Sequence, residues 1–346
     1  MKASGLMALG CLLLFGNALA RADSLSYTCD PSVSAAVCTV LNTTISGLYT
    51  STFSNLNANI YIEYGATGLS QSTTGFDNQI PYATYVSDLA AEDGPGIVRA
   101  DAIASLSITE PALYDGAPID ISSALGAALG ISGLAGTTAN GNYCIVGTTG
   151  CYNGIITVTN DPSTSLYYRF GTIDADAFDF FSLAEHETDE VLGTASCIDT
   201  TGPGNTLVNN CPNNTAAAVD LYRYNAGSRV LVDSTVGAYF SYDGGATNGA
   251  GGALYNTLPN GEDYADFISG CPGDPRVQDA SGCPGFAGLD ITNDGGAEIN
   301  ILDALGYNLN QPNSVTPEPS PRALVGLGLA LLAFFRFRPR KSAVLP

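Results

Sequence analysis

The stretch "DAFDFFSLAEHETDEVLG", residues 176–193, contains His186, which is the only histidine of the 346-residue chain. Its apolar side chains recur at helical spacing and predict a buried helix that ends at Gly193. These apolar residues are Phe180, Leu183, Ala184, Val191 and Leu192. On such a helix His186 and Glu190 share a face because they are four residues apart, and Glu187 lies beside that face. These three residues are therefore candidates for a site of catalysis.

An imidazole and a carboxylate placed in this way can bind one divalent ion, and Glu187 could act as general base on water that the ion activates. The pattern is that of the H-E-x-x-H zinc proteases, with glutamate in place of the second histidine. Gly193 stands where the longer metzincin motif has its glycine, and Ser196 stands where that motif has its third ligand. Serine is a poor zinc ligand, and a Met-turn is excluded because Met1 and Met7 are the only methionines. The alternative is a solvated helix face without a metal.

Further motifs follow this helix in a fixed order. They are "AEHETDEVLGTAS" (184–196), "AVDLYRYNAGSR" (218–229), "AYFSYDGG" (238–245), "GEDYADF" (261–267), "RVQDA" (276–280) and "LDALGYNL" (302–309). Over roughly residues 50–310 the chain resembles a family of secreted bacterial metalloprotease-like proteins with the motif H-E-[I/T]-x-E-V-[L/M]-G. The resemblance implies a zincin fold distantly like matrixins and serralysins, in which glutamate replaces the second histidine as a rule.

The expected fold is a mixed α/β (α+β) domain: a zincin-like mixed sheet with an active-site helix, and a disulfide-bonded, loop-rich C-terminal half. Alternating or apolar segments predict strands at 57–65, 154–160 and 166–172, and a strand meander at 220–245. Helices are expected at 121–133 and 298–309. The segment 23–309 would form this domain.

The metal expected is Zn²⁺, held by His186 and Glu190 and by a third ligand from elsewhere. The candidates for that ligand are, in order, Asp220, Tyr222 and Ser196. With Glu187 as general base, the protein would hydrolyse peptide bonds in a protein or peptide substrate. The alternative is a non-catalytic protein of the cell surface or matrix that retains the scaffold.

A Ca²⁺ ion is a further expectation from the acidic stretch "DITNDG" (290–295), which matches the first half of a calcium loop. The twelfth position is Ile301 instead of a bidentate glutamate, so the EF-hand interpretation fails. An acid-rich turn without a metal is the simpler interpretation of this stretch.

The two ends of the chain indicate export. Residues 1–22 have the positive start, apolar run and small-residue cleavage patterns of a signal peptide. Residues 310–320 form a linker with the triplet Pro317–Glu318–Pro319, and residues 321–346 contain an apolar segment, Ala323–Phe335, before a basic cluster. This tail resembles the PEP-CTERM sorting signal, which implies a Gram-negative host, processing by an exosortase, and delivery to the cell surface or exopolysaccharide matrix. A transmembrane helix and transient membrane contact are expected there; the alternative is a permanent tail anchor.

Cysteine usage and charge agree with export. Eight cysteines remain after the signal peptide and form four close pairs in sequence, which predicts a disulfide framework. They are Cys29, Cys38, Cys144, Cys151, Cys197, Cys211, Cys271 and Cys283; local pairing is the simplest connectivity. Between residues 23 and 314, five arginines face 32 acidic residues, a formal net charge of −27. Such a chain repels nucleic acid and attracts cations.

Overall fold

The computed structural model describes residues 24–310 except 75–77, 93, 95, 107–117, 199–214, 231–235, 258–262 and 273–274. The signal peptide predicted at 1–22, the tail predicted at 321–346 and nearly all of the linker lie outside the described residues. Within those residues, no helix combines the length and the apolar character needed to cross a membrane. The expectation of a transmembrane helix is therefore wrong for the described residues. The segment that suggested it, Ala323–Phe335, lies outside them.

The main sheet has four strands in the order β1-β2-β9-β3. β1 (Ser24–Cys29), β2 (Asn57–Gly65) and β9 (Gly154–Thr159) run parallel, and β3 (Ser70–Thr74) joins β9 as an antiparallel edge strand. The alternating and apolar segments that predict strands at 57–65 and 154–160 are therefore β2 and β9. Ile60, Ile62, Ile156 and Val158 of these strands enter the core, since a strand with a helix layer against it buries every second side chain or more.

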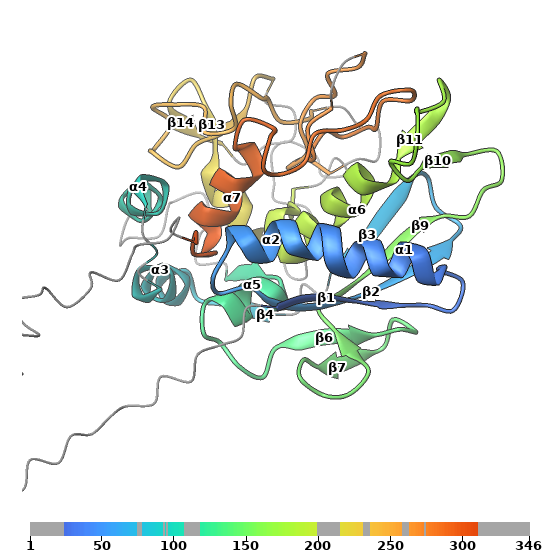
Figure 1. Cartoon of the computed structure of the whole chain (residues 1–346). Helices are drawn as coiled ribbons and strands as arrows, with labels where there is room; N and C mark the ends of the chain where they lie inside the picture. The colour runs from blue at the N-terminus through green and yellow to red at the C-terminus, as the bar shows by residue number, and fades with distance from the viewer. Residues whose placement is uncertain are drawn as a thin grey trace, which may run out of the picture.

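Helices lie on one face of this sheet (Figure 1). α1 (Ala35–Val40), a π-helical turn (Leu41–Ile45) and α2 (Ser46–Thr52) form one helical segment between β1 and β2. Beside it runs α6 (Phe180–Asp189), which continues through a π-helical turn, η2 (Glu190–Thr194). The opposite face carries a small sheet of β6 (Ala135–Thr138), β7 (Tyr143–Ile145) and β8 (Cys151–Tyr152), placed below the main sheet in Figure 1.

Shorter elements complete the domain. They are β4 (Asn78–Ile80), α3 (Tyr82–Ala91), α4 (Ile97–Ser105), β5 (Ile119–Ile121), α5 (Ser123–Ala128), β10 (Ser165–Tyr167), β11 (Ala177–Asp179), β12 (Ala216–Ala217), the 3₁₀ turn η4 (Ala218–Tyr222), β13 (Arg223–Asn225), β14 (Ser228–Arg229), β15 (Tyr239–Phe240) and α7 (Ala297–Leu305). β12, β5 and β4 form one sheet, and β14, β13 and β15 form another. The prediction of a mixed α/β (α+β) domain is confirmed.

Several expected elements differ in extent. The helix expected at 121–133 is α5 alone, preceded by β5, and the strand expected at 166–172 is shortened to β10. The meander expected at 220–245 begins with η4 and continues as β13, β14 and β15, with 231–235 outside the described residues. Between Phe240 and Ala297 the described residues form loops and isolated bridges but no longer element. The C-terminal half is therefore loop-rich, as predicted.

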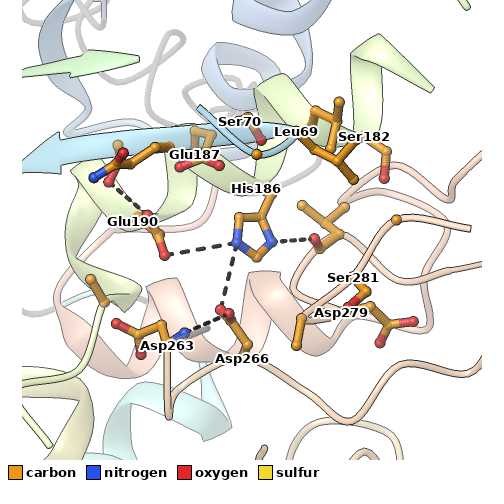
Figure 2. Close-up of a pocket in the computed structure, with 18 of the residues that line it drawn as sticks. Leu69, Ser70, Ser182, His186, Glu187, Glu190, Asp263, Asp266, Asp279 and Ser281 are labelled. Carbon is orange, nitrogen blue, oxygen red and sulfur yellow. Dashed lines mark hydrogen bonds and ion pairs between the residues drawn. The ribbon is translucent and has the colours of Figure 1, made fainter. Parts of the chain in front are cut away.

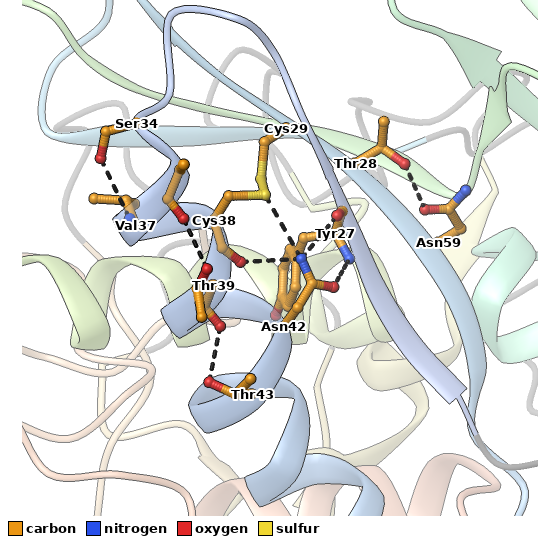
Figure 3. The surroundings of a disulfide bond; sticks show 11 residues. Tyr27, Thr28, Cys29, Ser34, Val37, Cys38, Thr39, Asn42, Thr43 and Asn59 are labelled. Atoms are coloured by element: carbon orange, nitrogen blue, oxygen red, sulfur yellow. Dashed lines mark hydrogen bonds between the residues drawn. A yellow bond between two sulfur atoms is a disulfide. The ribbon is translucent and has the colours of Figure 1, made fainter.

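Disulfides fasten several of these loops. Cys29–Cys38 ties the end of β1 to α1 (Figure 3), Cys144–Cys151 joins β7 to β8, and Cys271–Cys283 closes a loop of the C-terminal half. Cys197 is disulfide-bonded as well, while Cys211, its expected partner, lies outside the described residues. The three pairs follow the local connectivity that the sequence favours.

Candidate metal centre and catalytic cleft

α6 is the element that carries the candidate residues, and its start is fixed by Asp179. The Asp179 side chain accepts a hydrogen bond from the backbone N–H of Phe181 at 3.1 Å, so that the helix begins at Phe180 and residues 177–179 form β11 instead. Asp179 also receives a bidentate contact from Arg169. An N-cap that accepts a helix N–H and holds a salt bridge stabilises this end of the helix.

The helix ends where the sequence predicts, at Gly193. This residue has φ 122°, a backbone conformation that residues other than glycine rarely adopt. Where η2 packs against the sheet, a Cβ on Gly154 of β9 would meet a Val191 methyl at 2.6 Å. The two glycines therefore let the helix end turn sharply and lie close to the sheet, which holds His186 and Glu190 at a fixed height above β3.

His186 projects from α6 into a cleft and is held in one orientation (Figure 2). Its Nδ1 lies 2.9 Å from the carbonyl oxygen of Val277, so Nδ1–H donates there and, in the neutral ring, Nε2 is the nitrogen that can bind a cation. On the other side, the Gln278 amide donates to the carbonyl oxygen of His186 at 3.2 Å. The segment 277–278 thus holds both the ring and the backbone of the only histidine.

Nε2 of His186 faces two carboxylates. It lies 3.7 Å from Oε1 of Glu190 and 3.6 Å from Oδ1 of Asp266. The three facing atoms lie within 4.8 Å of one another, and among the described residues this is the one group of this kind that could hold a metal ion. A divalent ion bound by one nitrogen and two carboxylate oxygens is a combination that Zn²⁺ accepts.

In each of these residues, a partner holds the atom that faces away from the group. Ser72 of β3 donates to Oε2 of Glu190 at 2.6 Å, and the backbone N–H of Asp263 donates to Oδ2 of Asp266 at 3.1 Å. Oδ1 of Asp266 is buried and has no hydrogen-bond partner among the described residues. A buried carboxylate oxygen without a partner is costly, so the group fits a cation at this position.

The ionisation of the group reflects the same crowding. Burial raises the pKa of Glu190 to about 8, and the neighbouring carboxylate of Glu187 contributes to the rise. Burial also raises the pKa of Asp266 well above its ordinary value. Burial alone would lower the pKa of His186, but the carboxylates of Asp266, Glu187 and Glu190 outweigh it and raise that pKa to about 10. Without a metal, protons must compensate the negative charge; with one, the ion does so.

The residues that the sequence offers as third ligand lie elsewhere. Asp220 accepts from Ser196 Oγ at 2.5 Å and from the backbone N–H groups of Cys197 and Ala217 at 3.0 and 2.9 Å. Tyr222 is buried in the core and donates to the carbonyl oxygen of Ala304. Asp220 and Ser196 therefore stabilise the chain after η2, and none of the three belongs to the group around His186.

Asp266 is the residue that sequence reasoning missed. It lies in "GEDYADF", a motif that resembles the family but whose acids have no helical spacing relative to His186. Hydrogen bonds bring it to the histidine: Phe267 N–H donates to the carbonyl oxygen of Gln278, and Ala280 N–H donates to that of Phe267. The segments 266–267 and 277–280 run side by side, and both contact His186.

Glu187 stands next to this group. Its side chain is 4% exposed and lines the same cleft, which has a volume of about 710 Å³. β3 forms one wall of the cleft, and residues 275–282 form the other. A cleft of this size falls in the usual range for ligand-binding sites, and Glu187 lines it beside His186.

Several side chains of the acidic stretch at 290–295 form hydrogen bonds or ion pairs within the protein. Asp290 forms an ion pair with Arg169, and Asp294 accepts from the backbone N–H of Gly296 at the start of α7. The Asn293 side chain accepts from the Asp290 N–H. Oδ2 of Asp294, however, is buried without a hydrogen-bond partner among the described residues. Binding of Ca²⁺ at "DITNDG" therefore stays a prediction beside the simpler interpretation as an acid-rich turn.

Comparisons with known proteins add no relative. No family model matches this chain, and neither does any curated protein or solved structure.

Proposed function

We propose that this protein is an exported, metal-dependent peptidase with Zn²⁺ as its ion, and a divergent member of the secreted zincin-like family that its motifs resemble. One observation carries the proposal. His186, Glu190 and Asp266 turn one ligand atom each toward a common point while their other polar atoms are held by the protein, and Glu187 lies beside them in a cleft.

The ion would supply Lewis acidity that activates water and polarises a carbonyl group. The protein's own residues would do the rest. The cleft would hold the peptide between β3 and the segment 275–282. Glu187 would take a proton from the attacking water and pass it to the leaving amine, so that water adds across the C–N bond. Val277 would keep the imidazole in the tautomer that leaves Nε2 free.

Export is part of the proposal. Disulfides are typical of exported proteins, and the chain contains Cys29–Cys38, Cys144–Cys151 and Cys271–Cys283. With the signal-like residues 1–22 and the sorting-signal-like tail, they support delivery to the cell surface or matrix of a Gram-negative bacterium after exosortase processing.

The test compares the purified protein with its Glu187→Gln variant. We expect about one equivalent of bound Zn²⁺ in both proteins, and hydrolysis of casein or peptides by the first alone, abolished by a chelator. Glutamine preserves the size of the side chain but cannot accept the proton. A protein without bound metal or hydrolysis would refute the proposal. Equal activity in the two proteins would remove Glu187 from the mechanism.

If metal binds in both proteins but neither hydrolyses any peptide, the non-catalytic surface protein becomes the better description.

A further inference from the structure

The side chains that line the cleft are unusually polar. Hydroxyl groups occupy the β3 wall, at Ser70, Ser72, Thr73 and Thr74. Carboxylates occupy the helix and the opposite wall, at Glu187, Glu190, Asp263, Asp266 and Asp279. Arg276 is the one arginine among the described lining residues, and its guanidinium donates to the carbonyl oxygen of Gly251. The cleft is therefore lined by far more acidic than basic side chains.

A divalent ion would not remove this imbalance. Glu190 and Asp266 would neutralise the two charges of the ion, which leaves Glu187, Asp263 and Asp279. Asp263 is already committed, because its carboxylate accepts from the backbone N–H groups of Ser196 and Ala265. Glu187 faces the reacting bond. Asp279 is thus the carboxylate that remains for a substrate side chain.

Asp279 has the geometry of a side chain held ready for a ligand. It is 8% exposed, and its Oδ2 accepts from the backbone N–H groups of Gly270 and Arg276 at 3.3 and 3.2 Å. Oδ1 has no hydrogen-bond partner among the described residues. Asp279 lines the catalytic cleft and also a neighbouring pocket of about 440 Å³. In Figure 2 it lies on the opposite side of His186 from Glu190. A side chain bound there would lie to one side of the reacting bond.

We propose that the cleft selects basic polypeptides and that Asp279 binds a lysine or arginine side chain of the substrate beside the bond that is cleaved. This inference rests on the proposed peptidase function and names its substrate class. A carboxylate fixed by two backbone donors forms a strong charge-assisted bond to an ammonium or guanidinium group. The formal charge of −27 between residues 23 and 314 attracts such substrates over a longer range and repels acidic ones.

The test uses the zinc-loaded protein and peptides that differ at one position, scanned along the sequence, with lysine, norleucine or glutamate. At one position we expect kcat/KM for lysine to exceed that for norleucine at least about tenfold, and glutamate to be the poorest. Asp279→Asn should reduce the lysine-to-norleucine ratio to near one, since the amide retains the acceptor for the two N–H groups but loses the charge. Asp161→Asn, the same loss of charge at an exposed position outside the cleft, should leave the ratio as it is.

A second measurement does not depend on turnover. Fluorescence anisotropy with zinc-loaded Glu187→Gln protein should show tighter binding of the lysine peptide than of its glutamate counterpart, and the added Asp279→Asn change should abolish that preference. Hydrolysis without a preference for basic peptides, or a preference that persists in Asp279→Asn, would overturn this inference and leave the peptidase intact. If the protein hydrolyses no peptide but binds the lysine peptide more tightly in a way that needs Asp279, the peptidase proposal fails and the preference for basic peptides stands.

Discussion

Replacing Asp266 by asparagine tests zinc affinity separately from the stability of the fold. Asp266 supplies one of the two carboxylate oxygens that face Nε2 of His186, and its Oδ1 has no hydrogen-bond partner among the described residues. Asparagine keeps the acceptor for the Asp263 N–H but loses the charge. Loss of a residue that merely orients a ligand weakens metal binding about 10- to 100-fold. Loss of an anionic ligand should cost at least about 100-fold, or about 2.7 kcal/mol.

Asp220→Asn is the matched control, because sequence reasoning prefers Asp220 as the ligand. Its carboxylate accepts three hydrogen bonds from Ser196, Cys197 and Ala217. The amide oxygen of asparagine can still accept from the two backbone N–H groups that bond to Oδ2, but the charge is lost and the amide NH₂ faces Ser196 Oγ, which donates to Oδ1 in the wild type. Hydrogen bonds to charged groups contribute about 1.5–3 kcal/mol each. We therefore expect Asp220→Asn to lower the free energy of unfolding by about 2–4 kcal/mol with little change in zinc affinity.

Thermal unfolding with and without zinc distinguishes the two effects. At a zinc concentration about 100 times Kd, the wild-type protein gains about 2.7 kcal/mol, and its Tm should rise by about 5 °C or more. Asp266→Asn should lose this gain, yet in chelator it should melt no lower than the wild type, because it removes a buried charge from a crowded acidic group. If Asp266→Asn keeps the zinc-dependent rise while Asp220→Asn loses it, Asp220 is the ligand and our assignment is wrong.

Three further predictions follow from other contacts. Gln278→Ala removes the amide that holds the His186 carbonyl, so zinc affinity measured by competition with a chromophoric chelator should fall about 10- to 100-fold; unchanged affinity would show that the amide plays no part in positioning. Gly193→Ala places a Cβ at φ 122° and 3.3 Å from Leu125, so urea unfolding should show a loss of about 1–3 kcal/mol; no loss would mean that the turn tolerates a side chain. Burial raises the pKa of Asp303 to about 6 from 3.8 despite Arg99, so its protonation stabilises the folded state fully below pH 3.8, and this contribution is lost as pH rises through 6. Across that window the free energy of unfolding of the wild type should fall by about 3 kcal/mol more than that of Asp303→Asn. Equal pH slopes in the two proteins would contradict the assignment.

Helix α6 could be predicted from sequence because its determinants are local. Apolar spacing at Phe180, Ala184 and Val191 defines its buried face, and Gly193 marks its end. The position of its first residue could not be predicted. Asp179 decides it, and its carboxylate is also held by Arg169, in the bend after β10, and by the Gly288 N–H.

The helical segment at 35–52 was not anticipated at all. Its serines and threonines have low helix propensity, and packing supplies what propensity does not. Leu41, Ile45 and Tyr49 are fully buried against the sheet and α6. Such tertiary stabilisation is invisible in a local sequence window.

The third ligand shows the same limit in the site. The two proposed ligands on one helix, His186 and Glu190, have a spacing that the sequence reveals, whereas Asp266 belongs to a segment without regular secondary structure. Its position depends on the hydrogen bonds of Phe267 to the chain on either side of Asp279. No local sequence pattern predicts that this pairing forms.

The pairing also explains what the loop-rich C-terminal half contributes. The segment 266–267 brings Asp266 to Nε2 of His186, and the segment next to it brings Val277 to Nδ1. The same segment continues to Asp279 on the wall of the cleft, and the disulfide Cys271–Cys283 encloses it. The proposed metal ligand Asp266, the carbonyl group of Val277 that orients His186 and the proposed substrate-binding carboxylate of Asp279 therefore belong to one hydrogen-bonded unit. A shift of this unit would move all three together, so metal binding and substrate selection should be lost in parallel when its hydrogen bonds are broken, and separately only when individual side chains are changed.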